Sequence, residues 1–142
     1  MYEIHQIPTP WELFRIECGQ GWECLYSPLI SYIQNYNEGK PTDEQIQIVQ
    51  IKEKFGGLRF YVNNATEELN DMINKAEDES YHVCEICGSR ENIGYTQGYI
   101  QTLCHKCVKD FAIKNERVYR WREQGSNDVF CISQDKDELI AK

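Results

Sequence analysis

Residues 84–107 read CEICGSRENIGYTQGYIQTLCHKC, and this stretch decides the fold of the second half of the chain. It contains two Cys-x-x-Cys pairs, Cys84 with Cys87 and Cys104 with Cys107, separated by 16 residues. Each pair lets two thiolates converge on one tetrahedral ion at about 2.3 Å, and two such pairs complete a shell of four thiolates. The spacing therefore predicts a zinc site.

The residues around the two pairs predict a knuckle, a β-hairpin and a helix, the order found in a treble-clef or ribbon-like zinc module. Gly94 and Gly98 favour a hairpin between the pairs. Val108, Phe111 and Ala112 follow at helical spacing, so we expect the second pair at a helix N-terminus, where the helix dipole favours thiolates. Because four cysteines leave no open coordination position, the expected cofactor is a structural Zn²⁺.

Two alternatives remain open for these cysteines. They could be unliganded core thiols or form disulfides, and His105, inside the second pair, could replace one cysteine as a ligand. The remaining cysteines, Cys18, Cys24 and Cys131, have no partner at metal-binding spacing. We expect them to be small buried hydrophobic residues.

Upstream of the cysteines, residues 46–63 predict a β-hairpin with Gly56-Gly57 as its two-residue turn. That turn would place Lys54 opposite Arg59. Because side chains alternate across a strand, one face of the hairpin should be apolar and the other basic. The apolar face is expected to hold Val49, Ile51, Phe55, Leu58, Phe60 and Val62, with Glu53 as the exception.

The basic face of the predicted hairpin carries Lys52, Lys54, Arg59 and Tyr61. Like charges opposite one another destabilise an antiparallel pair, so this face needs acidic side chains or an anion against it. One interpretation is pairing with the acidic helix that follows in the chain. The other is a site for an anionic, nucleotide-like ligand, which arginine and lysine would hold by its phosphate and tyrosine by stacking.

Two helices are expected to flank this hairpin. The first should begin with Ser27 as its N-cap and the following proline as its first residue, and end before Gly39. The second should cover residues 64–82, beginning with a capping box of Asn64 and Glu67. Its acidic residues lie mostly away from its apolar face, which predicts a solvated surface.

The composition fits one globular domain of the α+β class. The chain has 142 residues, of which 41% are hydrophobic and 27% charged. We divide it into a helix–hairpin–helix part (1–82), a zinc module (83–116) and a C-terminal extension (117–142). The longest apolar runs are too short to cross a bilayer, and Met1–His5 lack the features of a secretory signal, so we expect a cytoplasmic protein without a membrane partner.

The net charge of −8 argues against a general nucleic-acid binder, because such domains are typically basic. A second basic segment nevertheless contains Arg117, Arg120, Trp121 and Arg122. One interpretation of these arginines and aromatic residues is a surface for a nucleic acid or protein partner. The other is that the arginines surround a tryptophan packed in the core. The sequence contains no HExxH motif, no GxSxG motif and no phosphate-binding glycine loop, which are signatures of catalysis. We therefore expect that the protein is not an enzyme.

Four strings together resemble small, largely uncharacterised proteins of phage and prophage genomes. They are Gly21-Trp22, the KEKFGGLRFY string at 52–61, the CxxCG at 84–88 and the CxxC at 104–107. The resemblance covers roughly residues 21–110 and implies an accessory phage protein that interferes with, or regulates, host processes. The leading hypothesis is a non-enzymatic binder of an anionic or nucleotide-like small molecule, which could sequester a host defence signal. The alternatives are an inhibitor or adaptor of a host protein and a zinc-containing nucleic-acid-binding regulator. The oligomeric state is left open.

Overall fold

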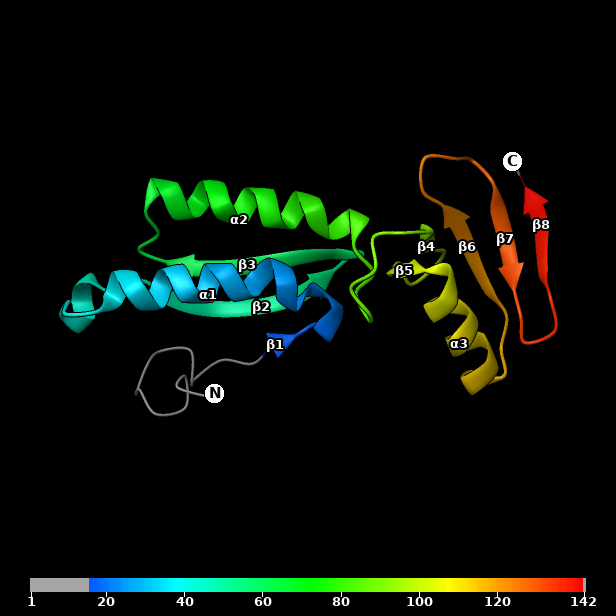
Figure 1. Ribbon diagram of the computed structural model, residues 1–142, viewed down its shortest axis with the longest axis horizontal. Helices are drawn as coiled ribbons and strands as arrows, with labels where there is room; N and C mark the ends of the chain where they lie inside the picture. The colour runs from blue at the N-terminus through cyan, green and yellow to red at the C-terminus, as the bar shows by residue number, and fades with distance from the viewer. Residues whose placement is uncertain (1–15, 142) are drawn as a thin grey trace.

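The computed structural model describes residues 16–141 and has mixed α and β structure in two units joined near residue 83 (Figure 1). Met1–His5, on which the cytoplasmic prediction partly rests, lie outside the described residues. In the described part of the chain, no helix has the length and apolar character needed to cross a bilayer.

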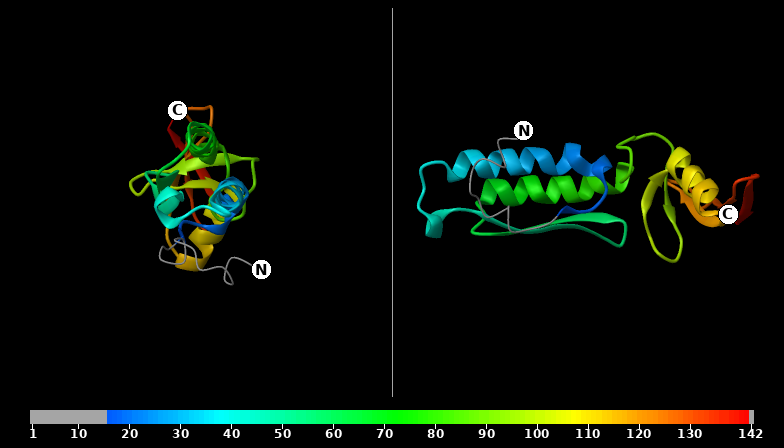
Figure 2. Two further views of the ribbon diagram at one scale, coloured as in Figure 1. Left: turned by 90° about the vertical axis from the view of Figure 1, so that its left-hand side faces the viewer. Right: turned by 90° about the horizontal axis from the view of Figure 1, so that it is seen from below.

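The N-terminal unit (residues 16–83) is a three-stranded sheet with two helices on one of its faces. The sheet has the order β1–β2–β3, in which β1 is parallel and β3 antiparallel to β2. Both helices lie on the same side of the sheet, which leaves the other face without a helix (Figures 1 and 2). The elements are β1 (Ile16–Glu17), η3 (Gln20–Trp22), α1 (Glu23–Asn37), η4 (Thr42–Glu44), β2 (Gln47–Lys54), β3 (Gly57–Asn63), α2 (Glu67–Glu79) and η5 (Ser80–His82).

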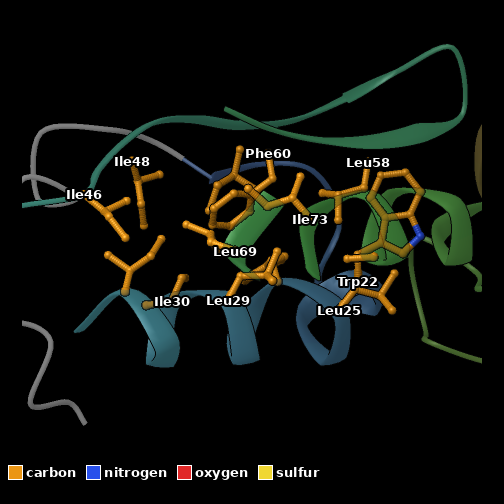
Figure 3. Close-up of a cluster of buried hydrophobic side chains, with 14 of the residues drawn as sticks. Trp22, Leu25, Leu29, Ile30, Ile46, Ile48, Leu58, Phe60, Leu69 and Ile73 are labelled. Atoms are coloured by element: carbon orange, nitrogen blue, oxygen red, sulfur yellow. The ribbon is translucent and has the colours of Figure 1, made fainter. Parts of the chain in front are cut away.

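The core of the N-terminal unit lies between the sheet and the two helices (Figure 3). Trp22 is fully buried there, as its size predicts, and its indole N–H donates to the carbonyl of Val83 at 2.9 Å. Apolar residues recur at helical spacing along α1 and α2, so each helix presents one stripe to the sheet. The buried side chains of α2 are Leu69, Ile73 and Ala76.

The predicted starts of both helices were wrong, although the second helix has the apolar face that was predicted for it. Helix α1 begins at Glu23 instead of Ser27, and Pro28 lies inside it. Helix α2 is capped by Thr66 instead of Asn64: the Thr66 hydroxyl accepts from the backbone N–H of Leu69 at 3.0 Å. Asn64 has φ of +62°, a left-handed conformation that a helical residue does not adopt.

The hairpin exists, but its turn is one residue earlier than predicted. Phe55 and Gly56 form the turn, with φ of +53° and +83°, and Lys54 pairs with Gly57. Lys52, not Lys54, is therefore opposite Arg59. The second glycine is instead needed for close packing, since a Cβ on Gly57 would lie 2.3 Å from the Tyr81 hydroxyl oxygen.

Two residues expected on the apolar face of the hairpin are exposed. Phe55 is 69% exposed because it lies in the turn, and Val49 is 51% exposed at an irregularity between Ile48 and Gln50. Ile48 takes the core position instead and is 4% exposed. The other expected core residues of the strands are buried or partly buried: Ile51, Leu58, Phe60 and Val62.

The C-terminal unit (residues 84–141) combines a cysteine knuckle, a hairpin and a helix with three further strands. Its antiparallel sheet has the order β5–β4–β6–β7–β8, so the predicted C-terminal extension (117–142) adds strands to the hairpin between the two cysteine pairs. A second hydrophobic cluster packs between this sheet and α3. The elements are β4 (Ile93–Thr96), β5 (Thr102–Cys104), α3 (His105–Asn115), β6 (Tyr119–Glu123), β7 (Val129–Ile132) and β8 (Asp137–Ala141).

Candidate metal centre and unit junction

The four cysteines of the two pairs converge on one point. The Sγ atoms of Cys84, Cys87, Cys104 and Cys107 all lie within 4.8 Å of one another. Cys87 Sγ and Cys104 Sγ are 3.6 Å apart, whereas a disulfide bond needs about 2.0 Å. A tetrahedral ion with bonds of 2.3 Å separates its sulfur ligands by about 3.8 Å. The cluster therefore has the dimensions of a tetrathiolate metal site.

Local structure positions each pair as the sequence predicts. Gly88 follows the first pair with φ of +82°, and its N–H donates to the carbonyl of Cys84 at 3.0 Å, which closes the knuckle. Cys104 is the N-cap of α3, and Cys107 lies in the first turn. Burial opposes ionisation of Cys87, but the Ser89 backbone N–H and the three neighbouring thiols outweigh it and lower the pKa of the Cys87 thiol.

The remaining cysteines and His105 lie outside the cluster. All seven cysteines are free, which excludes the disulfide alternative in this structure. His105 Nε2 lies 2.6 Å from Asp137 Oδ2, so its ring pairs with a carboxylate of β8. Cys18 and Cys131 are partly buried, whereas Cys24 is exposed, so the prediction that it is a buried hydrophobe was wrong.

The knuckle packs directly against the start of the N-terminal unit. The Gly21 N–H donates to the Glu85 carbonyl at 2.7 Å, and the Gly19 N–H donates to the Glu85 carboxylate at 2.9 Å. A Cβ on Gly21 would lie 2.2 Å from the Cys84 carbonyl oxygen, so only glycine permits this approach. Burial raises the pKa of the Glu85 carboxyl, opposed by the Gly19 N–H.

The hairpin turn makes the second contact between the units. The Thr102 hydroxyl donates to the Gly56 carbonyl at 2.7 Å, and the Tyr99 hydroxyl donates to Glu53 at 3.0 Å. Glu53 also accepts from the Gly56 N–H, which explains how this carboxylate fits the otherwise apolar face. We call the contact region between the two units the junction; three of the four sequence strings behind the phage resemblance contribute residues to it, namely Gly21-Trp22, the string at 52–61 and the CxxCG at 84–88.

The predicted ligand residues of the hairpin share the face of the sheet on which no helix of residues 16–141 packs; we call it the open face. Lys52 pairs directly with Arg59, Lys54 is exposed on the same face, and Tyr61 is 39% exposed. The acidic helix α2 packs on the opposite face, and none of the three basic side chains forms an ion pair within residues 16–141. In the described chain the expected pairing with α2 is absent.

Arg59 differs from the two lysines because its guanidinium is engaged. Its Nη1 donates to the Leu58 carbonyl at 2.8 Å and its Nη2 to the Tyr81 hydroxyl at 3.1 Å. The Tyr81 hydrogen bond raises the pKa of Arg59, and burial opposes this effect. These two hydrogen bonds hold the Arg59 guanidinium beside Tyr81, close to the junction.

The second basic segment separates into core and surface. Trp121 is 2% exposed, and its indole N–H donates to the Leu103 carbonyl at 3.0 Å, so it belongs to the core. Arg117 and Arg120 are exposed, and the guanidinium of Arg122 lies 5.3 Å from the centre of the Tyr95 ring. The interpretation of arginines around a packed tryptophan agrees with this arrangement.

Beside the junction is a cavity of about 420 Å³ that the sequence did not reveal. It is lined by residues of the hairpin turn, of the segment after α2, and of β4, β6 and the β4–β5 loop. Arg122 is the one sequence-predicted residue that lines it. The cavity was missed because its walls are far apart in the sequence and carry no common motif.

No family model, curated protein or solved structure matches this chain. The resemblance to phage and prophage proteins therefore stays a prediction. Of the pattern behind it, the convergence of the four cysteines is confirmed.

Proposed function

We propose that this protein is a non-enzymatic binding protein that holds an anionic, nucleotide-like small molecule on the open face of the β1–β2–β3 sheet. The observation that carries this proposal is the cross-strand pair of Lys52 and Arg59, with Lys54 beside it on the same face. In the described chain, no carboxylate neutralises these side chains by an ion pair. An anion on this face would relieve their repulsion.

The side chains supply complementary contacts for a phosphate-bearing ligand. Lysine offers a mobile point charge, while the fixed guanidinium of Arg59 keeps further N–H donors free for oxygen atoms. Tyr61 adds a partly exposed ring. Glu17 of β1 is in register with Lys52, and its carboxylate accepts from the Gln50 amide at 3.0 Å instead of forming an ion pair with Lys52.

We further propose that the four-cysteine cluster holds a structural Zn²⁺. Four sulfur ligands at these separations suit zinc and fill its coordination shell, so no position is left for a substrate. A reducing compartment such as the cytoplasm would keep the thiols available for the metal. Together with the resemblance to phage proteins, this supports a role inside an infected host cell, where the protein would sequester an anionic defence signal.

The proposal is tested by titrating the zinc-loaded protein with inorganic pyrophosphate and with ribonucleoside diphosphates in a calorimeter at low salt. Lys52→Ala and Lys54→Ala should each weaken binding about 5-fold or more, equivalent to about 1 kcal/mol. Glu17→Gln should strengthen it, because a nearby negative charge is removed. Lys75→Ala on α2 is the matched control and should have no effect. Absence of binding at millimolar concentration, or unchanged affinity of both lysine variants, would refute the proposal.

A protein partner is the second candidate function, because the same sheet carries exposed apolar side chains. Ile16 is 45% and Val49 51% exposed. Native mass spectrometry of protein recovered from a host lysate separates the two functions. A retained mass of a few hundred daltons supports the small-molecule binder, whereas a co-purified protein supports an adaptor. A nucleic-acid partner would show binding that weakens by orders of magnitude between about 50 and 200 mM salt.

A further inference from the structure

The cavity beside the junction has the size and lining of a small-molecule site. Its volume of about 420 Å³ lies within the range of roughly 300–1,000 Å³ that is usual for ligand pockets. Aromatic rings line it from three separate parts of the chain, and one cation and one amide add polarity. The lining residues that matter here are Phe55, Tyr81, Tyr95, Gln97, Ile100 and Arg122.

Two of the three rings, those of Tyr81 and Tyr95, are held by contacts with the fold. The Tyr95 hydroxyl donates to the Tyr81 carbonyl at 2.7 Å, which joins β4 to the segment after α2. The Tyr81 ring packs where a side chain on Gly57 would otherwise lie. Rings held in this way are preorganised, so a planar ligand could stack on them at little cost in conformational entropy.

The cavity is on the same side of the hairpin as the basic face. Gly57 pairs with Lys54, and side chains of paired residues point to the same face of a sheet. Because the Tyr81 ring occupies the side-chain position of Gly57, it lies on the face of Lys54 and Arg59. The hydrogen bond of 3.1 Å from Arg59 Nη2 to the Tyr81 hydroxyl agrees with this placement.

Two guanidinium groups therefore flank the two tyrosines. Arg122 lies over the Tyr95 ring at 5.3 Å, inside the cavity, and Arg59 is bound to the hydroxyl of Tyr81. In the described chain neither arginine forms an ion pair with a carboxylate. If a ligand placed its ring between these aromatic side chains, an anionic group attached to the ring could accept hydrogen bonds from the N–H groups of a guanidinium.

We infer that this cavity binds the planar ring of a nucleotide, whose phosphate groups are held by Arg122 and Arg59 at the edge of the basic sheet face. The inference rests on the proposed function and names its ligand class. Gln97 supplies a hydrogen-bonding amide for the edge of a base, and Ile100 an apolar wall. A ligand with a planar ring joined to phosphate fits this cavity best, because aromatic side chains can stack on the ring and the arginines can bind the phosphate.

The experiment compares ADP, GDP and UDP with inorganic pyrophosphate in calorimetric titrations of the full, zinc-loaded chain. Phe55→Asn removes one ring, and asparagine suits the left-handed backbone of this turn position, so the variant should fold. We expect it to weaken binding of at least one nucleotide about 10-fold and to leave pyrophosphate binding unchanged. Arg122→Gln should weaken nucleotide and pyrophosphate binding alike.

Matched controls lie outside the cavity. Arg117 stacks over Tyr119 at 5.1 Å in the same manner as Arg122 over Tyr95, and Val118 is exposed like Phe55. Arg117→Gln and Val118→Asn should therefore leave all affinities unchanged. Circular dichroism and melting curves identify any variant that fails to fold.

The outcomes separate the inference from the proposed function. If Phe55→Asn and Arg122→Gln both leave nucleotide affinity unchanged while Lys52→Ala weakens pyrophosphate binding, the cavity inference is wrong and the anion-binding face stands. If nucleotides bind no more tightly than pyrophosphate, the cavity inference is again wrong. If neither pyrophosphate nor any nucleotide binds, both proposals are refuted.

Discussion

At the scale of single residues, Cys18 and Cys24 are close in sequence but differ in how far their thiols are exposed to solvent. Cys18 is partly buried against the core, and burial, together with the carboxylates of Glu85 and Glu53, raises the pKa of its thiol to about 12. Cys24, in the first turns of α1, is exposed. Since the thiolate is the reactive form of cysteine, these two residues should differ strongly towards alkylating reagents.

We expect iodoacetamide at pH 8 to label Cys24 rapidly and Cys18 slowly in the metal-loaded protein. A thiol of pKa about 12 is almost entirely protonated at pH 8, so the labelling rate of Cys18 should rise about 10-fold per pH unit between pH 8 and 11. Peptide mass spectrometry measures both rates, and labelling in denaturant is the control. Equal rates for the two cysteines in the native protein would contradict this prediction.

At the scale of elements, the end of α2 protects the outer edge of β3. The Phe60 N–H donates to the Glu77 carboxylate and the Leu58 N–H to the Ser80 hydroxyl, both at 2.9 Å. An edge strand without such partners presents unpaired N–H groups to other chains. Glu77 is near the C-terminal end of α2, where the helix dipole disfavours a negative charge. Any stabilisation of the fold by Glu77 therefore comes from its hydrogen bond to β3.

Glu77→Ala should therefore lower the free energy of unfolding by about 1.5–3 kcal/mol, the usual loss for a hydrogen bond to a charged group. Asp71→Ala, an exposed position on the same helix, is the control and should change it by less than about 0.5 kcal/mol. Urea denaturation measures both variants. A Glu77→Ala protein as stable as the control would show that this contact does not hold the edge of the sheet.

At the scale of the whole molecule, the two units are joined by contacts that start at the four-cysteine cluster. The knuckle that supplies Cys84 and Cys87 also carries the backbone onto which Gly21 packs. The hairpin turn is bound to β5 through Thr102, and the same strand ends at Cys104, the first residue of the second cysteine pair. Loss of the metal should therefore disturb the C-terminal unit first and the junction with it.

Cys107→Ser, or removal of the metal by a chelator, should unfold at least the C-terminal unit, because structural zinc contributes roughly 10 kcal/mol or more to such modules. Hydrogen exchange should show loss of amide protection over 93–132 and at the hairpin turn, with more protection left in α1 and α2. Cys131→Ser, outside the cluster, is the control and should retain protection. An unchanged melting curve after complete metal removal would refute a structural role.

The parts of this protein that could be predicted are those set by local spacing. Two Cys-x-x-Cys pairs predicted a four-thiolate cluster, since short-range geometry already brings each pair together. Apolar residues at helical spacing predicted the buried face of α2, since that spacing places them on one side of a helix. The basic face of the hairpin was also predicted, because a turn shifted by one residue left Lys52, Arg59 and Tyr61 on the same face.

Contacts between distant residues decided the rest. The sequence by itself determined the alternation of the hairpin and the closeness of the two cysteines within each pair, which depend on neighbours within a few residues. It also determined the α+β class and the four-cysteine cluster, because the hairpin predicted between the two pairs brings them together. The role of Gly57 could not be read from the sequence, because it depends on Tyr81, whose ring lies against it only in the folded chain. The tertiary structure alone placed the two units at a junction and formed the cavity, because its walls come from strands and loops that meet only after folding.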